Sequence, residues 1–184
     1  MSAMFELKVD ASAMIAMGNH FAQIKGKLPQ ALSTVVKAIG PQVLTAMRGA
    51  LPGQTGLTSK TINKALKGSM QATAYVIKSH GGDIRLKYFR PEETQAGVSA
   101  APWNHRQVYP ATFINSGWWP NRRAPIARGQ VLRRKGESKY PMIVVRSGLY
   151  IAEEMVKGAS ASAFYGTIDA RFAPAIEAVI LSAL

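Results

Sequence analysis

Residues 29–50, PQALSTVVKAIGPQVLTAMRGA, decide the fold because they carry a continuous apolar stripe. The apolar side chains recur every three or four positions, which is the period of a helix with one buried face. Pro29 suits a first helical turn, whereas Pro41 removes the hydrogen bond to the Lys37 carbonyl. We therefore expect a helix from Pro29 to residues 51–53, kinked or broken near Pro41. Its apolar stripe comprises Leu32, Val35, Val36, Ile39, Val43, Met47 and Ala50.

Upstream of this helix, the sequence predicts a strand and a separate helix. Residues 4–9 alternate between apolar and polar side chains, as a half-buried strand does. Asp10 or Ser12 can then cap a helix whose apolar residues continue to Ile24, with Gly26 near its end.

Downstream of the long helix, a short helix and a hairpin are expected. The short helix should cover residues 57–66. Residues 73–78 and 84–89 have the composition of two strands, and the glycines at 81–82 can supply the positive φ angles of a tight turn. Residues 90–101 are polar and small, and they indicate an exposed loop.

The second half of the chain adds short strands and a terminal helix. Pro110 restricts the first of these strands to a sheet edge or a bulge. Residues 115–129 contain the paired Trp118-Trp119 and are interpreted as an ordered excursion. The other elements are expected at residues 108–114, 130–134 and 142–145 (strands), 149–156 (a short helix or strand) and 167–184 (an amphipathic helix).

This order of elements predicts an α+β fold. A small antiparallel sheet should be packed by long N-terminal helices and a C-terminal helix. We expect one domain over residues 1–184, with an exposed loop near 90–101 and a basic loop or hairpin near 115–146.

Composition narrows the classes of partner. The chain has 184 residues, 47% of them apolar, and a formal net charge of +13, which suits one folded domain that attracts polyanions. It contains no cysteine, which excludes disulfides and thiolate sites. No apolar run reaches the roughly 18–20 residues that cross a bilayer, so we expect no transmembrane helix, and residues 1–9 show no secretory signal. The charge alone allows nucleic acid, an anionic membrane or an acidic protein as partner, and among these we expect no membrane.

Residue types that carry catalysis are sparse. None of the three histidines has a second ligand at metal-binding spacing. The adjacent acids Glu92-Glu93 and Glu153-Glu154 are interpreted as solvated charge, because neighbouring side chains diverge on a helix or strand. Residues 53–61 lack the phosphate-loop pattern, since Ser59 stands where a glycine is required. We expect neither an enzyme nor a bound cofactor or metal.

The positive charge is concentrated between Trp103 and Arg146, where there are nine cations and one acid. All three tryptophans lie in the same segment. A solvated basic loop accounts for this pattern, and so does a contact surface for DNA or for an acidic neighbour. No recognisable nucleic-acid-binding motif accompanies it.

Two segments resemble a known family of phage proteins. The first, LPGQTGL at residues 51–57 followed by Lys60-Thr61-Ile62, looks like a turn found in small tail-assembly proteins of long-tailed phages. The second resembles the core of the minor tail protein Z family, the tail completion proteins of lambda-like phages, in ATFI at 111–114, Gly117-Trp118, VLRRKG at 131–136 and KYPM at 139–142. In that family a long helical end follows, as residues 167–184 would provide here.

This resemblance implies a virion structural protein at the head-proximal end of the tail. Such a protein completes the tail so that it joins the head, and it positions the DNA end for ejection. The resemblance also implies a homo-oligomeric ring, six-fold like the tail tube, next to tail terminator and tail tube proteins. The protein would reside in the virion, and in the host cytoplasm during assembly, without enzyme activity or cofactor.

Within such a ring, the basic segment would line the channel for DNA or form contacts between subunits. Trp118 and Trp119 would anchor a subunit interface, with core packing as the equal alternative. The cations would make weak, sequence-independent phosphate contacts, or would serve as surface charges or intersubunit ion pairs. They are Arg122, Arg123, Arg128, Arg133, Arg134 and Lys135.

The sequence leaves other functions open. A tail terminator or a head-side connector of the same neck is an alternative with similar architecture. A free, sequence-independent DNA-binding protein is a further alternative, motivated by the net charge of +13.

Overall fold

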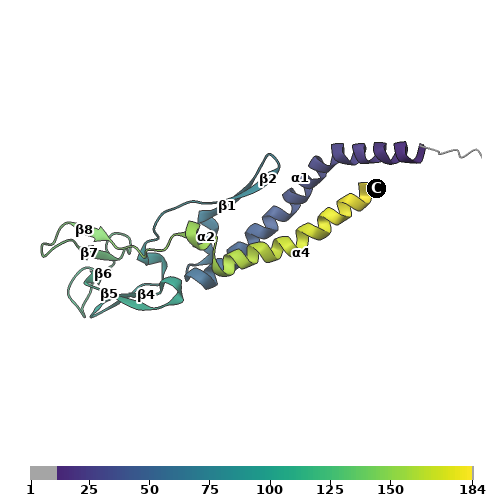
Figure 1. Ribbon diagram of the computed structural model, residues 1–184. Helices are drawn as coiled ribbons and strands as arrows, with labels where there is room; N and C mark the ends of the chain where they lie inside the picture. The colour runs from purple at the N-terminus through teal and green to yellow at the C-terminus, as the bar shows by residue number, and fades with distance from the viewer. Residues whose placement is uncertain (1–11, 184) are drawn as a thin grey trace, which may run out of the picture.

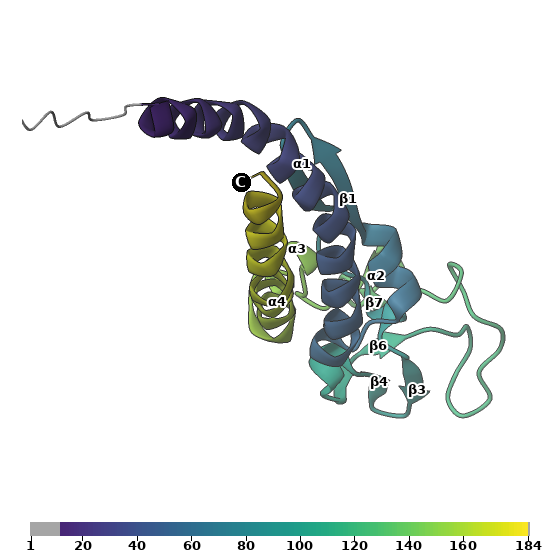
Figure 2. The same ribbon diagram turned by 90° about the vertical axis from the view of Figure 1, so that its right-hand side faces the viewer.

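The computed structural model describes residues 12–183, and it has a helical stem and a β-rich body. Two long helices, α1 (Ser12–Thr55) and α4 (Gly158–Ala183), pack side by side and antiparallel to form the stem. The hairpin of residues 66–79 lies alongside α1, and the later strands gather at and beyond one end of the stem (Figures 1 and 2). The strand expected at residues 4–9 lies outside the described residues.

The N-terminal helical region is one helix, so the prediction of two helices was wrong. Helix α1 contains Pro29, Pro41 and Pro52 and continues through all three. It changes direction within its first half (Figure 2) rather than breaking at Pro41. The stripe on either side of Pro41 remains buried, and Val43 and Met47 are 4% and 3% exposed. This burial outweighs the roughly 3 kcal/mol that a proline costs inside a helix.

The end of α1 lies at Thr55, beyond the predicted Leu51-Pro52-Gly53 stop. The Thr55 hydroxyl donates to the Leu51 carbonyl at 2.7 Å, which satisfies one of the last carbonyls of the helix. Gly56 follows with a φ of +78°, and its N–H donates to the Pro52 carbonyl at 3.0 Å. Because a left-handed residue terminates a helix and glycine adopts it without strain, Gly56 sets the boundary.

A short helix and a hairpin follow α1. Helix α2 (Ser59–Ala65) confirms the helix expected at residues 57–66, and Thr58 caps it by accepting the Thr61 N–H. Strand β1 (Leu66–Gln71) pairs antiparallel with β2 (Ala74–Ser79). The predicted strand at 73–78 is therefore present, but its partner is the segment before it and not residues 84–89.

The hairpin is seated on α1 through a tyrosine between two glycines. A Cβ atom built on Gly40 would lie 2.2 Å from Tyr75 Cγ, and one on Gly68 would lie 2.5 Å from Tyr75 Oη. The Tyr75 ring therefore occupies space that exists only because α1 and β1 each lack a side chain at these positions. This packing explains why residues 66–71 pair with β2.

The segment expected as the second hairpin strand is a single turn of 3₁₀ helix. This turn, η1 (Leu86–Tyr88), replaces the strand predicted at 84–89. Leu86 and Phe89 are both 0% exposed, and their spacing of three residues places both in the core when the backbone turns. A strand would instead have pointed them to opposite faces.

The loop expected at residues 90–101 is a hairpin whose second strand is buried, which corrects that prediction. Strands β3 (Glu92–Thr94), β4 (Gly97–Ala100) and β5 (Gln107–Pro110) form an antiparallel sheet in the order β3-β4-β5. Every residue of β4 is buried. The small side chains of β4 fit the centre of a crowded sheet, although the composition of this segment had indicated an exposed loop. Pro110 ends an edge strand, as expected.

A third sheet continues the chain. It comprises β6 (Thr112–Phe113), β7 (Leu132–Arg134) and β8 (Met142–Val144), in the order β6-β7-β8 and antiparallel. A one-turn helix, η2 (Pro102–Asn104), lies between β4 and β5, and α3 (Ile151–Glu154) precedes α4. The α+β class with antiparallel pairing is confirmed, although the strands form three small sheets instead of one.

The hydrophobic core lies where the second half of α1 meets α2, α3 and the strands. Its fully buried members come from many elements, so the core connects the stem to the body. The largest are Leu51, Ile62, Leu66, Leu86, Phe89, Val98, Val131 and Leu149, all 0% exposed.

Candidate functional site

The basic arm, defined as residues 115–146, includes β7, β8 and the loops on either side of β7. The loop from β6 to β7 reaches away from the two long helices (Figure 2). Strands β7 and β8 confirm the strands expected at 130–134 and 142–145. The arm carries eight of the nine cations counted between Trp103 and Arg146, and one acid, Glu137. It is therefore a concentrated positive surface on the body.

An ion pair fixes the base of this arm. Arg122 Nε lies 3.4 Å from a carboxylate oxygen of Glu93, whose side chain is only 6% exposed. The same carboxylate accepts the backbone N–H groups of Ile114 and Asn115, at 3.3 and 3.1 Å. Arg122 Nη1 donates to the carbonyls of Asn115 and Gly117, at 3.3 and 3.0 Å. These contacts hold the start of the β6–β7 loop in a folded conformation.

This arrangement corrects the expectation for Glu93. Glu93 is not solvated charge, because its carboxylate is buried and binds a guanidinium and two backbone donors. Arg122 binds Glu93 within its own subunit, and its expected role as a DNA contact, an intersubunit ion pair or a surface charge stays a prediction. The other cations of the predicted set are left for external contacts.

Those other cations are exposed. Arg133 and Arg134 are consecutive on β7, so they project toward opposite faces of the sheet. The Arg134 guanidinium lies 6.0 Å from the centre of the Phe113 ring. Within the described residues, none of the five forms an ion pair. The five are Arg123, Arg128, Arg133, Arg134 and Lys135.

The paired tryptophans lie on the surface of the arm. Trp118 is 88% exposed and Trp119 is 44% exposed. Trp118 therefore does not pack in the core, which removes that alternative for its side chain. Exposed tryptophans are typical of contact surfaces, since they bury a large apolar area when a partner covers them. Their anchoring of a subunit interface stays a prediction.

A groove runs between the β3–β4 turn and the arm. Its volume is about 810 Å³, and its lining combines aromatic and charged side chains from distant parts of the sequence. Trp118 and Tyr140 supply aromatic rings, whereas Arg134 and Lys139 supply positive charge. The tertiary pairing of β6, β7 and β8 brings these residues together, and no local sequence pattern had indicated the groove.

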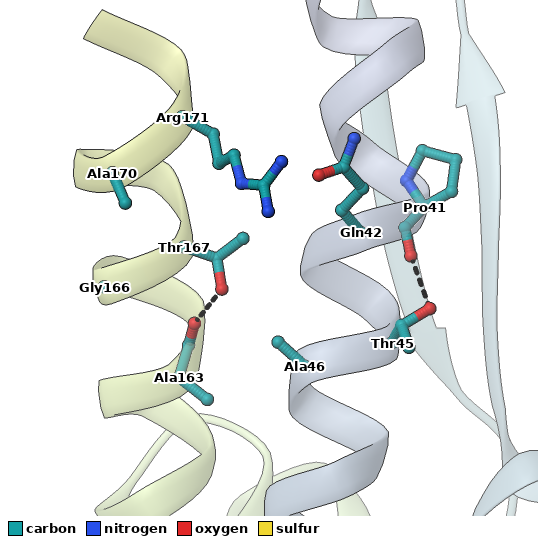
Figure 3. Close-up of a pocket in the computed structure, with 9 residues that line it drawn as sticks. All are labelled: Pro41, Gln42, Thr45, Ala46, Ala163, Gly166, Thr167, Ala170 and Arg171. Carbon is teal, nitrogen blue, oxygen red and sulfur yellow. Dashed lines mark hydrogen bonds between the residues drawn. The ribbon is translucent and has the colours of Figure 1, made fainter.

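A second groove lies between the helices of the stem (Figure 3). Thr45 donates its hydroxyl to the Pro41 carbonyl at 2.8 Å, and Thr167 donates to the Ala163 carbonyl at 2.7 Å. Both hydroxyls are thus occupied by their own helices. Most of the other residues that line this groove have small side chains, and Arg171 is the one charged residue among them. This groove offers no pair of groups for acid–base chemistry.

A buried carboxylate that sequence reasoning missed connects α1, η2, α3 and the start of α4. Glu154 is 3% exposed, so its interpretation as solvated charge was wrong. It accepts Trp103 Nε1 at 3.0 Å, Gln54 Nε2 at 2.8 Å and Lys157 Nζ at 3.0 Å. Burial acts to raise the pKa of Glu154, but these donors outweigh it and hold the pKa below its usual value. The cluster therefore favours an ionised carboxylate.

The same cluster explains the LPGQTGL segment as a structural junction. Gln54 donates to Glu154 and accepts the Ser160 N–H at 3.0 Å, so it ties the end of α1 to the start of α4. Leu57 is 3% exposed and belongs to the core. The segment holds elements together, in accord with its lack of a phosphate-loop pattern.

Further features of the described residues bear on chemistry and location. Within residues 12–183, no three histidine or acidic side chains gather at distances suited to a metal ion. In the same range, no helix combines the length and apolarity needed to cross a bilayer. Family models, curated proteins and solved structures were compared with the chain, and none matches it.

Proposed function

We propose that this protein is a virion structural protein at the head-proximal end of the tail of a long-tailed phage. In this role it is a repeated subunit of a tail completion or neck ring, and it carries out no reaction. The resemblance to the minor tail protein Z family motivates the proposal. The α+β architecture with long helices at both ends of the described chain agrees with that resemblance.

The exposed surface of the basic arm is the observation that carries the proposal. Trp118 leaves 88% of its surface in water, although burial of an aromatic side chain is strongly favourable. An exposed aromatic side chain of this kind marks a surface that a partner covers. In a closed ring every subunit presents the same surface to a neighbour, so one such arm suffices for the whole assembly.

The free cations of the arm suit a channel through which DNA passes. Arg123, Arg128, Arg133, Arg134 and Lys135 are exposed and outside ion pairs within the described chain. Contacts from such side chains to phosphates are independent of sequence and weaken with salt. Such contacts hold DNA without fixing its register, which allows ejection.

The mass and symmetry of the purified assembly test this proposal. We expect light scattering to give the mass of a ring and electron microscopy to show six-fold symmetry, with tail terminator and tail tube proteins as neighbours. Substituting Trp118 and Trp119 together by alanine should reduce assembly, whereas substituting the exposed Tyr165 on α4 should not. A monomer at all concentrations would contradict the proposal.

A second test uses particles assembled without the protein. We expect tails that fail to join heads, visible by negative-stain microscopy, and a loss of infectivity. Normal infectious particles would refute the proposed role. Tail termination and head-side connection are alternatives within the same neck, and the component that retains the protein after dissociation distinguishes them.

A free DNA-binding protein is a second candidate, favoured by the unpaired cations of the arm. It predicts duplex binding with an affinity that falls steeply with salt concentration, together with a monomeric protein. A salt-independent response, or no binding at low salt, would eliminate this candidate.

A further inference from the structure

The groove between the β3–β4 turn and the basic arm has the lining of a binding site for unpaired bases. Trp118 and Tyr140, which line it, are 88% and 67% exposed, so both present ring surface to the groove or its rim. Within residues 12–183, neither side chain forms a hydrogen bond, and neither belongs to the hydrophobic core. Their exposure has no explanation in the packing of this chain.

Positive charge accompanies these rings. Lys139 Nζ lies 5.6 Å from the centre of the Tyr140 ring, and the Arg134 guanidinium lies 6.0 Å from the centre of the Phe113 ring. Arg122 also lines the groove, but it is bound to Glu93. Glu137 also lines the groove, but Arg134 and Lys139 outnumber it, so an anionic ligand is favoured over a cationic one.

We propose that this groove binds single-stranded nucleic acid. Arg134 and Lys139 would contact phosphates while bases stack on Trp118 and Tyr140. Proteins bind single strands by combining a positive groove with aromatic platforms, because every unpaired base offers a ring face. In a duplex those faces are covered by neighbouring bases, so the aromatic rings would gain little. The inference rests on the proposed function for its setting, a channel occupied by DNA, and it names the form of DNA bound.

Fluorescence anisotropy with the full-length protein tests the inference. The probes are a labelled oligo(dT) of about 12 nucleotides and the same strand annealed to oligo(dA). We expect tighter binding of the single strand. The Trp118→Ala variant should weaken that binding by about 5-fold to 100-fold, with less effect on the duplex. The matched control Tyr165→Ala removes an exposed aromatic ring from α4 and should change neither affinity.

Salt dependence separates the phosphate contacts from the stacking. Substituting Arg134 and Lys139 by glutamine should lower the slope of log affinity against log salt by roughly 0.7 per contact, because a single strand releases that fraction of a counterion. Trp118→Ala should leave the slope unchanged. Arg171→Gln, on α4, is the control for loss of one exposed cation outside the groove.

Three results would overturn the inference. One is equal affinity for the single strand and the duplex with no effect of Trp118→Ala. Another is the absence of binding at low salt. The third is competition by an oligoglutamate peptide as effective as that by oligo(dT) at equal charge, which would assign the groove to an acidic protein. Because Trp118 is also the proposed interface anchor, the mass of each variant is measured first, and Tyr140→Ala, at a groove residue that the ring proposal does not use, is tested beside it. Tyr140→Ala should weaken single-strand binding and leave the mass of the assembly unchanged, so failure here is distinguishable from failure of the proposed ring.

Discussion

Replacing Glu154 by glutamine should destabilise the protein by about 2–3 kcal/mol. The carboxylate accepts three donors, Trp103 Nε1, Gln54 Nε2 and Lys157 Nζ, at 2.8 to 3.0 Å. Glutamine keeps the shape of the side chain but loses the charge, and its NH₂ group then faces at least one donor. Each hydrogen bond to a charged group contributes about 1.5–3 kcal/mol, and Lys157 is exposed, so we count little for its charge.

Thermal unfolding followed by circular dichroism measures this effect. For a chain of this size, the expected loss lowers the Tm by roughly 4–12 °C. Glu153→Gln is the matched control, because Glu153 is the exposed neighbour of Glu154 and should change stability by less than about 0.5 kcal/mol.

The contribution of Glu154 to stability should depend on pH in a direction that its pKa shift fixes. Because the pKa of Glu154 is lowered on folding, its ionisation stabilises the protein above the unfolded value and this contribution is lost as the pH falls through the folded pKa. The difference between the wild type and Glu154→Gln should therefore be greatest near neutral pH and shrink below pH 4.5, the usual value for the group. Equal losses of stability in Glu154→Gln and Glu153→Gln would refute the reasoning. A difference between the wild type and Glu154→Gln that does not change with pH would refute it as well.

Other substitutions test the packing and the arm. Leu51→Ala, at a fully buried position, should cost about 2–5 kcal/mol in chemical denaturation, and an effect below about 1 kcal/mol would contradict its place in the core. Gly97→Ala should destabilise strongly or prevent folding, because φ is +138° and a Cβ would lie 2.1 Å from the Tyr109 carbonyl oxygen; a soluble variant with unchanged Tm would disprove this. Arg122→Gln should accelerate proteolysis of the β6–β7 loop, whereas Arg123→Gln should not, and equal cleavage rates would argue against the Glu93 ion pair as the anchor.

The structure divides the cations of the basic arm into two groups. Arg122 is held by the buried Glu93 carboxylate and stabilises the loop that carries the tryptophans. Arg123, Arg128, Arg133, Arg134 and Lys135 are exposed and are the candidates for DNA or subunit contacts. A substitution series that treated all of them as equivalent would confuse a loss of loop structure with a loss of binding.

Residues close together in the sequence allowed much of the site to be predicted. The concentration of cations and tryptophans in one segment was visible from composition, and the strands at β7 and β8 were expected from local patterns. The groove was not predicted, because its lining includes the β3–β4 turn, which lies in a segment that the sequence had indicated as an exposed loop. Burial of β4 depends on which strands flank it, and small residues fit a crowded interior as well as a solvated loop.

The sequence by itself determined several of the helical and strand segments, the α+β class and the location of the positive charge. These follow from the period of apolar residues and from the residue types, which are local properties. Tertiary structure alone decided that α1 continues through Pro41, that β2 pairs with β1, and that Glu93 and Glu154 are buried. Each of these depends on contacts between residues far apart in the chain, where packing and hydrogen bonding outweigh local preference.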